Sequence, residues 1–233
     1  MTEVTTYQLR ALWNEMLAEL RGRDDVTIVK AELGDPVPEE VHGPLAEELG
    51  VPLTSGLAAY LGFANGIMLD WRIGEDEPDY GGSIHIGDLR VLRDPDTHLL
   101  GEQDGILIPA ELYGLSVEDS WLPFDFFKRD DENFELAGLL PNGERLDVFV
   151  TNDEIAAMDA TLLLGFGEYI ELVLRAFGSP LARAALEQMA PNDRRLRIED
   201  LHPGILSRSY SLDALIELTR SSPDVEQTRS FFR

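Results

Sequence analysis

Acidic side chains are the residues of this chain best suited to chemistry, because they occur in closely spaced groups. The 233 residues include 44 Asp and Glu against 19 Lys and Arg, which gives a net charge of −25. Three acidic groups stand out: Glu75-Asp76-Glu77-Asp79, Asp130-Asp131-Glu132 and Asp153-Glu154. Paired carboxylates perform acid–base catalysis only where burial or a like-charged neighbour shifts their pKa values. These groups lie in polar, turn-like sequence, which favours a solvated surface over a catalytic site.

Histidine and cysteine give little support for a metal site or a nucleophile. The four histidines are His42, His85, His98 and His202, and cysteine is absent. His85 with Asp88, or Asp96 with His98, could share a metal ion, but such pairs arise by chance in an acidic chain. The sequence also lacks a calcium-loop spacing, a phosphate-binding glycine loop after a strand and a Gly-x-Ser-x-Gly motif. We therefore predict a protein that is not an enzyme and that requires no metal or cofactor.

The negative charge is unevenly distributed along the chain. Residues 1–177 hold 36 Asp and Glu against 11 Lys and Arg, whereas residues 178–233 hold 8 of each. Such a surface repels nucleic acid and anionic membranes and attracts basic proteins, although high charge also serves solubility alone. No segment has the length of apolar sequence that a membrane span requires, and no signal-peptide pattern opens the chain. These features predict a cytoplasmic protein with a protein partner; they leave its oligomeric state open.

Several segments have clear secondary-structure patterns that could position the acidic groups. Apolar residues at helical spacing predict an amphipathic helix from Tyr7 to Arg21. Pro38 and two glutamates favour the start of a second helix, which Gly50 can end in the left-handed conformation. A third helix carries Leu57 to Ala64 and ends at Asn65-Gly66, a pair that reaches positive φ at low cost. The alternation from Ile67 to Ile73 then predicts a strand.

Later segments are predicted on the same grounds. The polar stretch 74–82 is typical of a long hairpin loop, and residues 83–86 of a strand. Residues 134–139 and 146–150 fit a hairpin around Asn142-Gly143, and residues 159–177 fit a helix with an apolar face. Ser179-Pro180, Ser211 and Ser222-Pro223 are suited to begin three further helices. We predict a main domain over residues 1–177 and a helical C-terminal extension over residues 178–233.

The order of elements between Val37 and Gly66 resembles the opening of the SMI1/KNR4 family, also called the SUKH superfamily. The matching residues are Glu47-Glu48-Leu49-Gly50, Pro52-Leu53 and Phe63-Ala64-Asn65-Gly66. The family's Leu-Pro step is inverted here to Pro-Leu, and its glycine pair after the asparagine is reduced to Gly66. The family's later hairpin and closing helix also have counterparts, in particular Phe166-Gly167-Glu168-Tyr169-Ile170. The resemblance covers approximately residues 37–177.

The resemblance implies an α+β fold, in which a largely antiparallel twisted sheet is flanked by N-terminal helices and closed by a C-terminal helix. Many bacterial members of the superfamily act as immunity proteins that bind and neutralise polymorphic toxins, often nucleases. The implied function is therefore binding of a basic toxin domain. The alternative is a cytoplasmic adaptor or regulatory scaffold, a role that other members have.

Charge and position together predict a partner-binding surface at the loop ends of the sheet, where exposed loops are held by rigid strands. The predicted residues are Asp70, Trp71, Glu75, Asp76, Glu77, Asp79, Asp125, Asp130, Asp131 and Glu132. Trp71 is included because tryptophan is enriched in binding hot spots, although it fills protein cores more often.

Overall fold

The computed structural model describes residues 4–74, 77–91, 122–128, 134–152, 160–179, 194–197 and 211–221. The helices are α1 (Thr6–Arg21), α2 (Glu39–Leu49), α3 (Ser55–Phe63), α4 (Phe166–Arg175) and α7 (Leu212–Ser221), with a 3-10 turn at Leu89–Val91. The strands are β1 (Val26–Leu33), β2 (Ile67–Ile73), β3 (Glu77–Ile86), β4 (Leu122–Lys128), β5 (Phe134–Asn142), β6 (Arg145–Asn152), β7 (Ala160–Gly165) and β8 (Arg194–Arg197).

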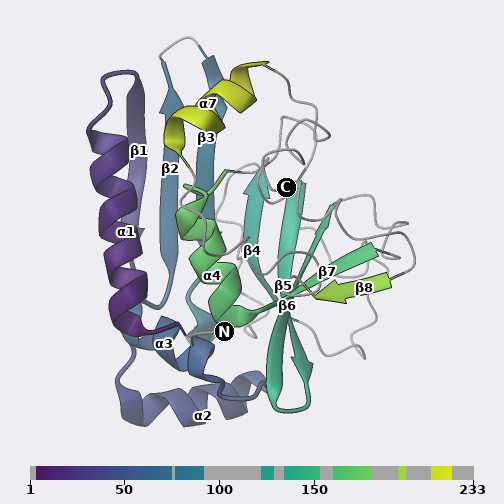
Figure 1. Ribbon diagram of the computed structural model, residues 1–233. Coiled ribbons are helices and arrows are strands. Elements are labelled where there is room, and N and C mark those ends of the chain that lie inside the picture. The colour runs from purple at the N-terminus through teal and green to yellow at the C-terminus, as the bar shows by residue number, and fades with distance from the viewer. Residues whose placement is uncertain are drawn as a thin grey trace.

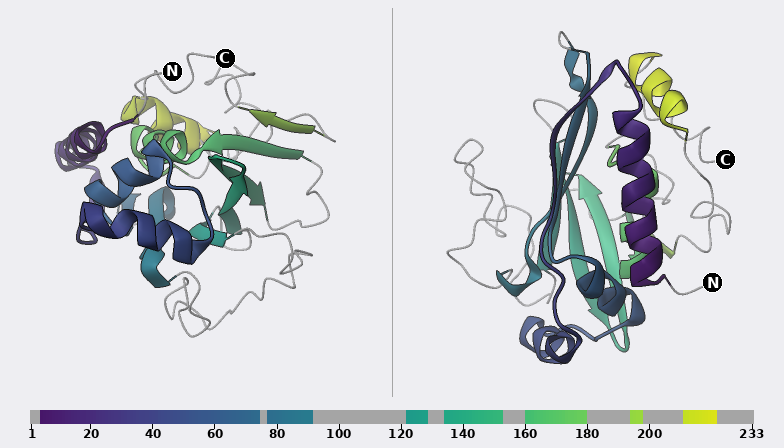
Figure 2. Two further views of the ribbon diagram at one scale, coloured as in Figure 1. Left: turned by 90° about the horizontal axis from the view of Figure 1, so that it is seen from below. Right: turned by 90° about the vertical axis from the view of Figure 1, so that its left-hand side faces the viewer.

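The eight described strands form one sheet in the order of the sequence, β1 to β8 (Figure 1). Each strand from β1 to β7 is antiparallel to the next, and β8 pairs with β7 in parallel. Helices α1, α4 and α7 lie on the same side of the sheet, while α2 lies at one end (Figure 2). The mixed α+β fold with a largely antiparallel sheet is therefore confirmed.

One face of β2 and β3 is buried beneath the helices and the other is partly open. Residues of β2 alternate strictly between buried and half-buried, with Ile67, Leu69, Trp71 and Ile73 on the buried side. This alternation follows from the two-residue period of a strand. The buried side chains join a single hydrophobic cluster with those of α1, α3 and α4.

The helices and the strand predicted between Pro38 and Ile73 are present in the structure. Gly50 ends α2 with a φ of 68°, and Thr54 accepts a hydrogen bond from the Leu57 N–H at the start of α3. Gly66 has a φ of 115°, and β2 begins at the next residue. These helix ends and this turn could be predicted from the sequence because each depends on only a few neighbouring residues.

Two sequence-based assignments were wrong in extent. Residues 77–82 belong to β3 and not to a loop. Their backbone pairs with β2, with Gly81 opposite Arg72 and Gly82 opposite Trp71. A Cβ atom at Gly81 would lie 1.9 Å from the Trp71 carbonyl oxygen, so a close approach of strands explains glycine there. Residues 160–165 form β7 and not the first turns of a helix, because they pair with β6. The helix α4 begins only at Phe166.

The turn after α4 is inserted beside β3 where β3 and β4 separate. The described β3–β4 register has one pair, Ile86 with Asp125. Farther along β3, the Ser83 N–H donates instead to the Gly178 carbonyl oxygen at 3.0 Å. Phe177 has a φ of 54°, which is unusual for a residue with a side chain and costs on the order of 1 kcal/mol. Burial of its ring and a hydrogen bond from Trp71 offset that cost.

The described residues after Gly178 pack on the main body. β8 extends the sheet, and Ser211 accepts a hydrogen bond from the Ala214 N–H at the start of α7, as predicted for that serine. Leu212, Leu215 and Ile216 of α7 are each at most 3% exposed and belong to the main hydrophobic cluster. Asp213 also forms an ion pair with Arg23. The helices predicted to begin at Ser179 and Ser222 lie outside the described residues.

Removal of residues 178–233 tests the predicted domain boundary. We expect the shortened chain to unfold at a lower urea concentration than the full chain, because core residues lose the apolar contacts of α7. Leu215→Ala in the full chain should cost about 2–4 kcal/mol for the same reason. Equal stability of the shortened and full chains, measured by urea unfolding, would instead support a separable extension.

Candidate binding surfaces

Two of the predicted binding residues, Asp70 and Trp71, are adjacent on β2 and point to opposite faces of the sheet. The Asp70 carboxylate is 2.6 Å from the Nε2 atom of His85, on the partly open face. Trp71 is 5% exposed, and its Nε1–H donates to the Phe177 carbonyl oxygen at 2.7 Å. Trp71 therefore holds the turn after α4 against the sheet, and its ring does not reach the surface.

A third predicted residue, Asp125, lies in the interior at the junction of β3 and β4. Its side chain is completely buried. One carboxylate oxygen accepts a hydrogen bond from the Tyr169 hydroxyl at 2.5 Å, and the other accepts from the His85 backbone N–H at 3.2 Å. A register shift between Pro123 and Asp125 accompanies this inward position. Asp125 thus links β3, β4 and α4 inside the protein, away from the exposed surface.

The other predicted residues lie wholly or partly outside the described part of the chain. Glu75, Asp76, Asp130, Asp131 and Glu132 lie outside the described residues, and Glu77 and Asp79 are described by their backbone in β3 alone. The antiparallel order places the β2–β3 connection and the β4–β5 connection at the same end of the sheet. The turn between α1 and β1 lies there too, since the Gly74 N–H donates to the Asp25 carbonyl oxygen. Asp24 in that turn is exposed.

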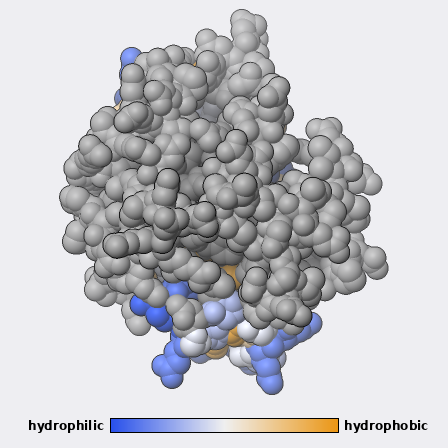
Figure 3. All heavy atoms as spheres, turned by 90° about the vertical axis from the view of Figure 1, so that its right-hand side faces the viewer, coloured by the Kyte–Doolittle hydropathy of each residue, from blue (hydrophilic) through white to orange (hydrophobic). Residues whose placement is uncertain are grey.

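The opposite end of the sheet carries a second acidic surface that the sequence analysis did not single out. We define the α2 surface as the exposed residues Asp35, Glu39, Glu40, Glu47 and Glu48. Exposed apolar side chains adjoin it in the sequence, with Val41 at 38% and Leu53 at 46% exposure. A usable signal was present in the sequence, because residues 31–71 contain no Lys or Arg. The β5–β6 turn lies toward the same end, where Figure 3 shows mainly hydrophilic described residues.

The Asn65-Gly66 turn is held by a partly buried polar network. The Asn65 amide donates to Asp88 at 2.5 Å and accepts from the Leu89 N–H at 2.9 Å, while the Tyr60 hydroxyl accepts from the Gly66 N–H. Burial raises the pKa of Tyr60 above its usual value, although the bond to Gly66 opposes the shift. Burial also disfavours the charged form of Asp88, but its bonds and attraction to Arg90 prevail and lower its pKa. This network is structural.

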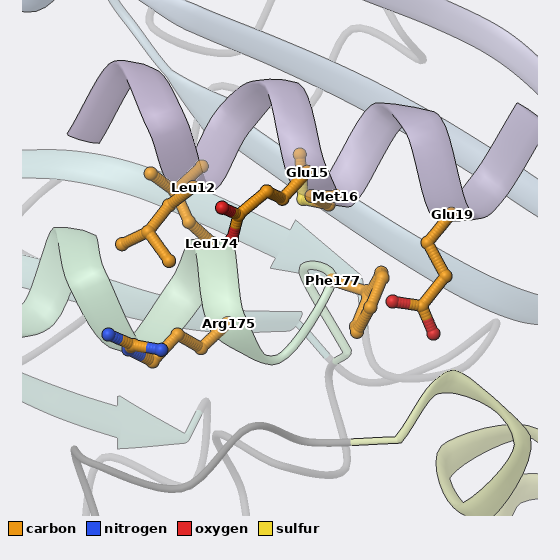
Figure 4. A pocket seen from close by; sticks show the side chains of 7 residues that line it. All are labelled: Leu12, Glu15, Met16, Glu19, Leu174, Arg175 and Phe177. Carbon is orange, nitrogen blue, oxygen red and sulfur yellow. The ribbon is translucent and has the colours of Figure 1, made fainter. Parts of the chain in front are cut away.

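A small groove lies between α1 and α4 (Figure 4). It has a volume of about 90 Å³ and is lined by Leu12, Glu15, Met16, Glu19, Leu174, Arg175 and Phe177. Sites for organic ligands usually occupy about 300–1,000 Å³, so this groove is too small for one. Two of its polar groups have partners: Arg175 pairs with Glu171 at 2.7 Å, and Glu19 accepts a hydrogen bond from the Leu212 N–H.

The described histidines do not form a metal centre. His42 is buried and donates to the Val37 carbonyl oxygen, and His85 contacts Asp70 as described above. His98 and His202 lie outside the described residues. Within the described ranges, no three His, Asp or Glu side chains are grouped so that they could hold a metal ion.

Comparisons with protein-family models, with curated proteins and with solved structures found no match to this chain. Among the described residues, no helix combines the length and apolar character needed to cross a membrane. The features that bear on function are therefore those of the chain itself: its charge, its exposed surfaces and its packing.

Proposed function

We propose that this protein works by binding a basic protein, without catalysis, in the manner of an immunity protein that neutralises a toxin. The observation that carries the proposal is the net charge of −25, all of which arises within residues 1–177. A negative electrostatic field accelerates encounter with a basic partner. The association rate constant of such steered complexes can reach about 10⁸–10⁹ M⁻¹s⁻¹ at low salt. The resemblance to the SMI1/KNR4 family supports the choice of a toxin as the partner.

The described surface carries exposed negative charge, as binding of a basic protein requires. The α2 surface presents four glutamates from one short helix, and its buried side, formed by Leu45, Ala46 and Leu49, fixes that helix to the body. Because the helix is held in place, binding requires little ordering of its backbone, and the remaining entropic cost is that of the glutamate side chains. The predicted acidic surface at the opposite end of the sheet offers the same chemistry from strand connections. The partner can therefore be sought by its charge.

Co-expression tests the proposal directly. A gene next to the one for this chain that encodes a protein with a basic C-terminal domain supplies the candidate toxin. We expect that domain to stop growth when expressed alone, and this protein to restore growth and to co-purify with the domain. Growth arrest that persists despite folded, abundant protein would contradict the toxin-neutralising role. Co-purification with a housekeeping protein instead would support the adaptor function.

Paired charge reversals distinguish the two acidic surfaces. Asp76→Lys with Glu77→Lys changes the predicted strand-end surface, and Glu47→Lys with Glu48→Lys changes the α2 surface. Each pair moves the net charge by the same amount, from −25 to −21, so long-range steering is matched. We expect the pair at the contacted surface to slow association by about 10-fold at low salt and the other pair to have a smaller effect.

Stopped-flow association over a salt series provides the measurement. Folding should be almost unaffected in both double variants, because Glu47 and Glu48 are exposed, Asp76 and Glu77 are predicted to be exposed, and exposed charges contribute little to stability. Equal effects of the two pairs would show that only the overall charge matters. Absence of any effect, at all salt concentrations, would contradict electrostatic steering of the partner.

A further inference from the structure

The strand β1 forms a free edge of the described sheet, and several of its side chains are exposed. Val29 is 62% and Leu33 is 37% exposed, which places two large apolar side chains in solvent on one short strand. The charged residues between them, Lys30 and Glu32, are 40% and 67% exposed in their side chains. A free edge offers unpaired backbone groups to any strand of matching pattern.

The register with β2 identifies which backbone groups of β1 face outward. The Gly34 N–H donates to the Gly66 carbonyl oxygen at 2.9 Å, so the backbone of Gly34 faces β2. Backbone hydrogen-bonding groups alternate in direction along an antiparallel strand. The backbone N–H and C=O groups of Glu32 and Lys30 therefore also face β2, where these residues pair with Met68 and Asp70. The N–H and C=O groups of Ala31 and Leu33 point away from the sheet.

These outward groups restrict how a second copy of β1 could pair with the first. A symmetric antiparallel pair can place Ala31 opposite Ala31, Ala31 opposite Leu33, or Leu33 opposite Leu33. With Ala31 on the two-fold axis, Lys30 of each strand lies opposite Glu32 of the other. The second arrangement places Glu32 opposite Glu32, and like charges in that position repel. The third places Lys30 opposite a residue after the end of β1, so Lys30 has no Glu32 opposite it.

The first arrangement also brings the exposed apolar residues together. With Ala31 on the axis, Val29 of each copy, at the bulge of β1, comes near Leu33 of the other, so both exposed side chains gain an apolar neighbour. We propose that β1 is a self-association edge, at which two copies of this chain pair antiparallel about Ala31. The sequence Val29-Lys30-Ala31-Glu32-Leu33 is thus complementary to itself in both charge and hydrophobicity.

Two features limit the strength of this dimer. The copies repel each other through net charges of −25, and a bulge between Ile28 and Lys30 shortens the strand that can pair. A contact of five residues is small, so we expect a weak dimer that forms at about 10 µM to 1 mM protein. At 0.15 M salt the screening length is about 8 Å, which reduces the overall repulsion more than the direct contact between Lys30 and Glu32.

Sedimentation equilibrium of the full chain, with single variants and their mixture, tests the proposal. Lys30→Glu places glutamate opposite glutamate in the dimer, and Glu32→Lys places lysine opposite lysine. We expect each variant alone to dimerise at least about 10-fold more weakly than the wild type, since two attractive pairs become repulsive. An equimolar mixture of the two variants should recover dimerisation, because both cross-strand pairs again join opposite charges.

Matched controls separate this effect from net charge and from misfolding. Arg10→Glu and Glu47→Lys change the charge as the two test variants do, at exposed positions away from β1, and should leave dimerisation within about two-fold of wild type. Ala31→Pro removes an outward N–H and should abolish the dimer while β1 stays paired with β2. A wild-type chain that remains monomeric throughout the concentration range would overturn the proposal. So would a dimer that is insensitive to Ala31→Pro, or a mixture no stronger than the single variants.

Discussion

Replacing Asp125 by alanine should lower the free energy of unfolding by about 3 kcal/mol, an effect expected of an interior residue and not of a surface contact. The carboxylate accepts hydrogen bonds from the Tyr169 hydroxyl and the His85 N–H where β3 and β4 separate. Alanine removes the acceptor that these two donors share, and a buried donor that loses its partner costs about 1–3 kcal/mol. Urea unfolding followed by circular dichroism measures the loss.

The double variant of Asp125→Ala and Tyr169→Phe identifies the contact responsible. Because the two side chains share one hydrogen bond, their combined cost should be smaller than the sum of the single costs. Asp24→Ala, at an exposed position in the α1–β1 turn, serves as the control and should change stability by no more than about 0.5 kcal/mol. A fully additive double variant would contradict the role assigned to the bond. Weakened partner binding by Asp125→Ala at full stability would return Asp125 to the binding surface.

Replacing Trp71 by alanine should be at least as damaging, with a loss of about 3–5 kcal/mol. The ring is 5% exposed and belongs to the main hydrophobic cluster, so alanine leaves a cavity between the sheet and the turn after α4. Trp71→Phe retains most of the apolar volume but removes the Nε1–H donor to Phe177. Trp71→Phe should therefore cost less than Trp71→Ala, and its cost includes about 1 kcal/mol for the lost hydrogen bond.

Tyr7 provides the matched aromatic control for Trp71. It lies in α1 and is 82% exposed, so Tyr7→Ala should alter stability by less than about 1 kcal/mol. The same urea titration applies to all three variants. If Trp71→Ala unfolded at the same urea concentration as the wild type, the ring would have to lie on the surface in solution, where the hot-spot role would apply.

Features that depend on a few neighbouring residues could be predicted from the sequence. The end of α2 at Gly50, the break at Asn65-Gly66, the strand from Ile67 to Ile73 and the start of α7 after Ser211 follow from backbone preferences and capping. The hairpin around Gly143, which has a φ of 64°, belongs with them. The excess of acid, and hence the class of partner we propose, is also a property of the sequence alone.

Features that depend on pairing between distant segments could not be predicted in this way. Residues 160–165 have the apolar pattern of a helix face, yet β6 offers an open edge and they join it as β7. Residues 77–82 look like a polar loop, and only the close approach of β2 shows why glycine is required. Asp125 is one of many acidic residues in the sequence, but the separation of β3 from β4 places it in the core beside Tyr169. Acidic residues are thus exposed on α2 and buried on β4, because the elements packed around a position decide whether its carboxylate meets water.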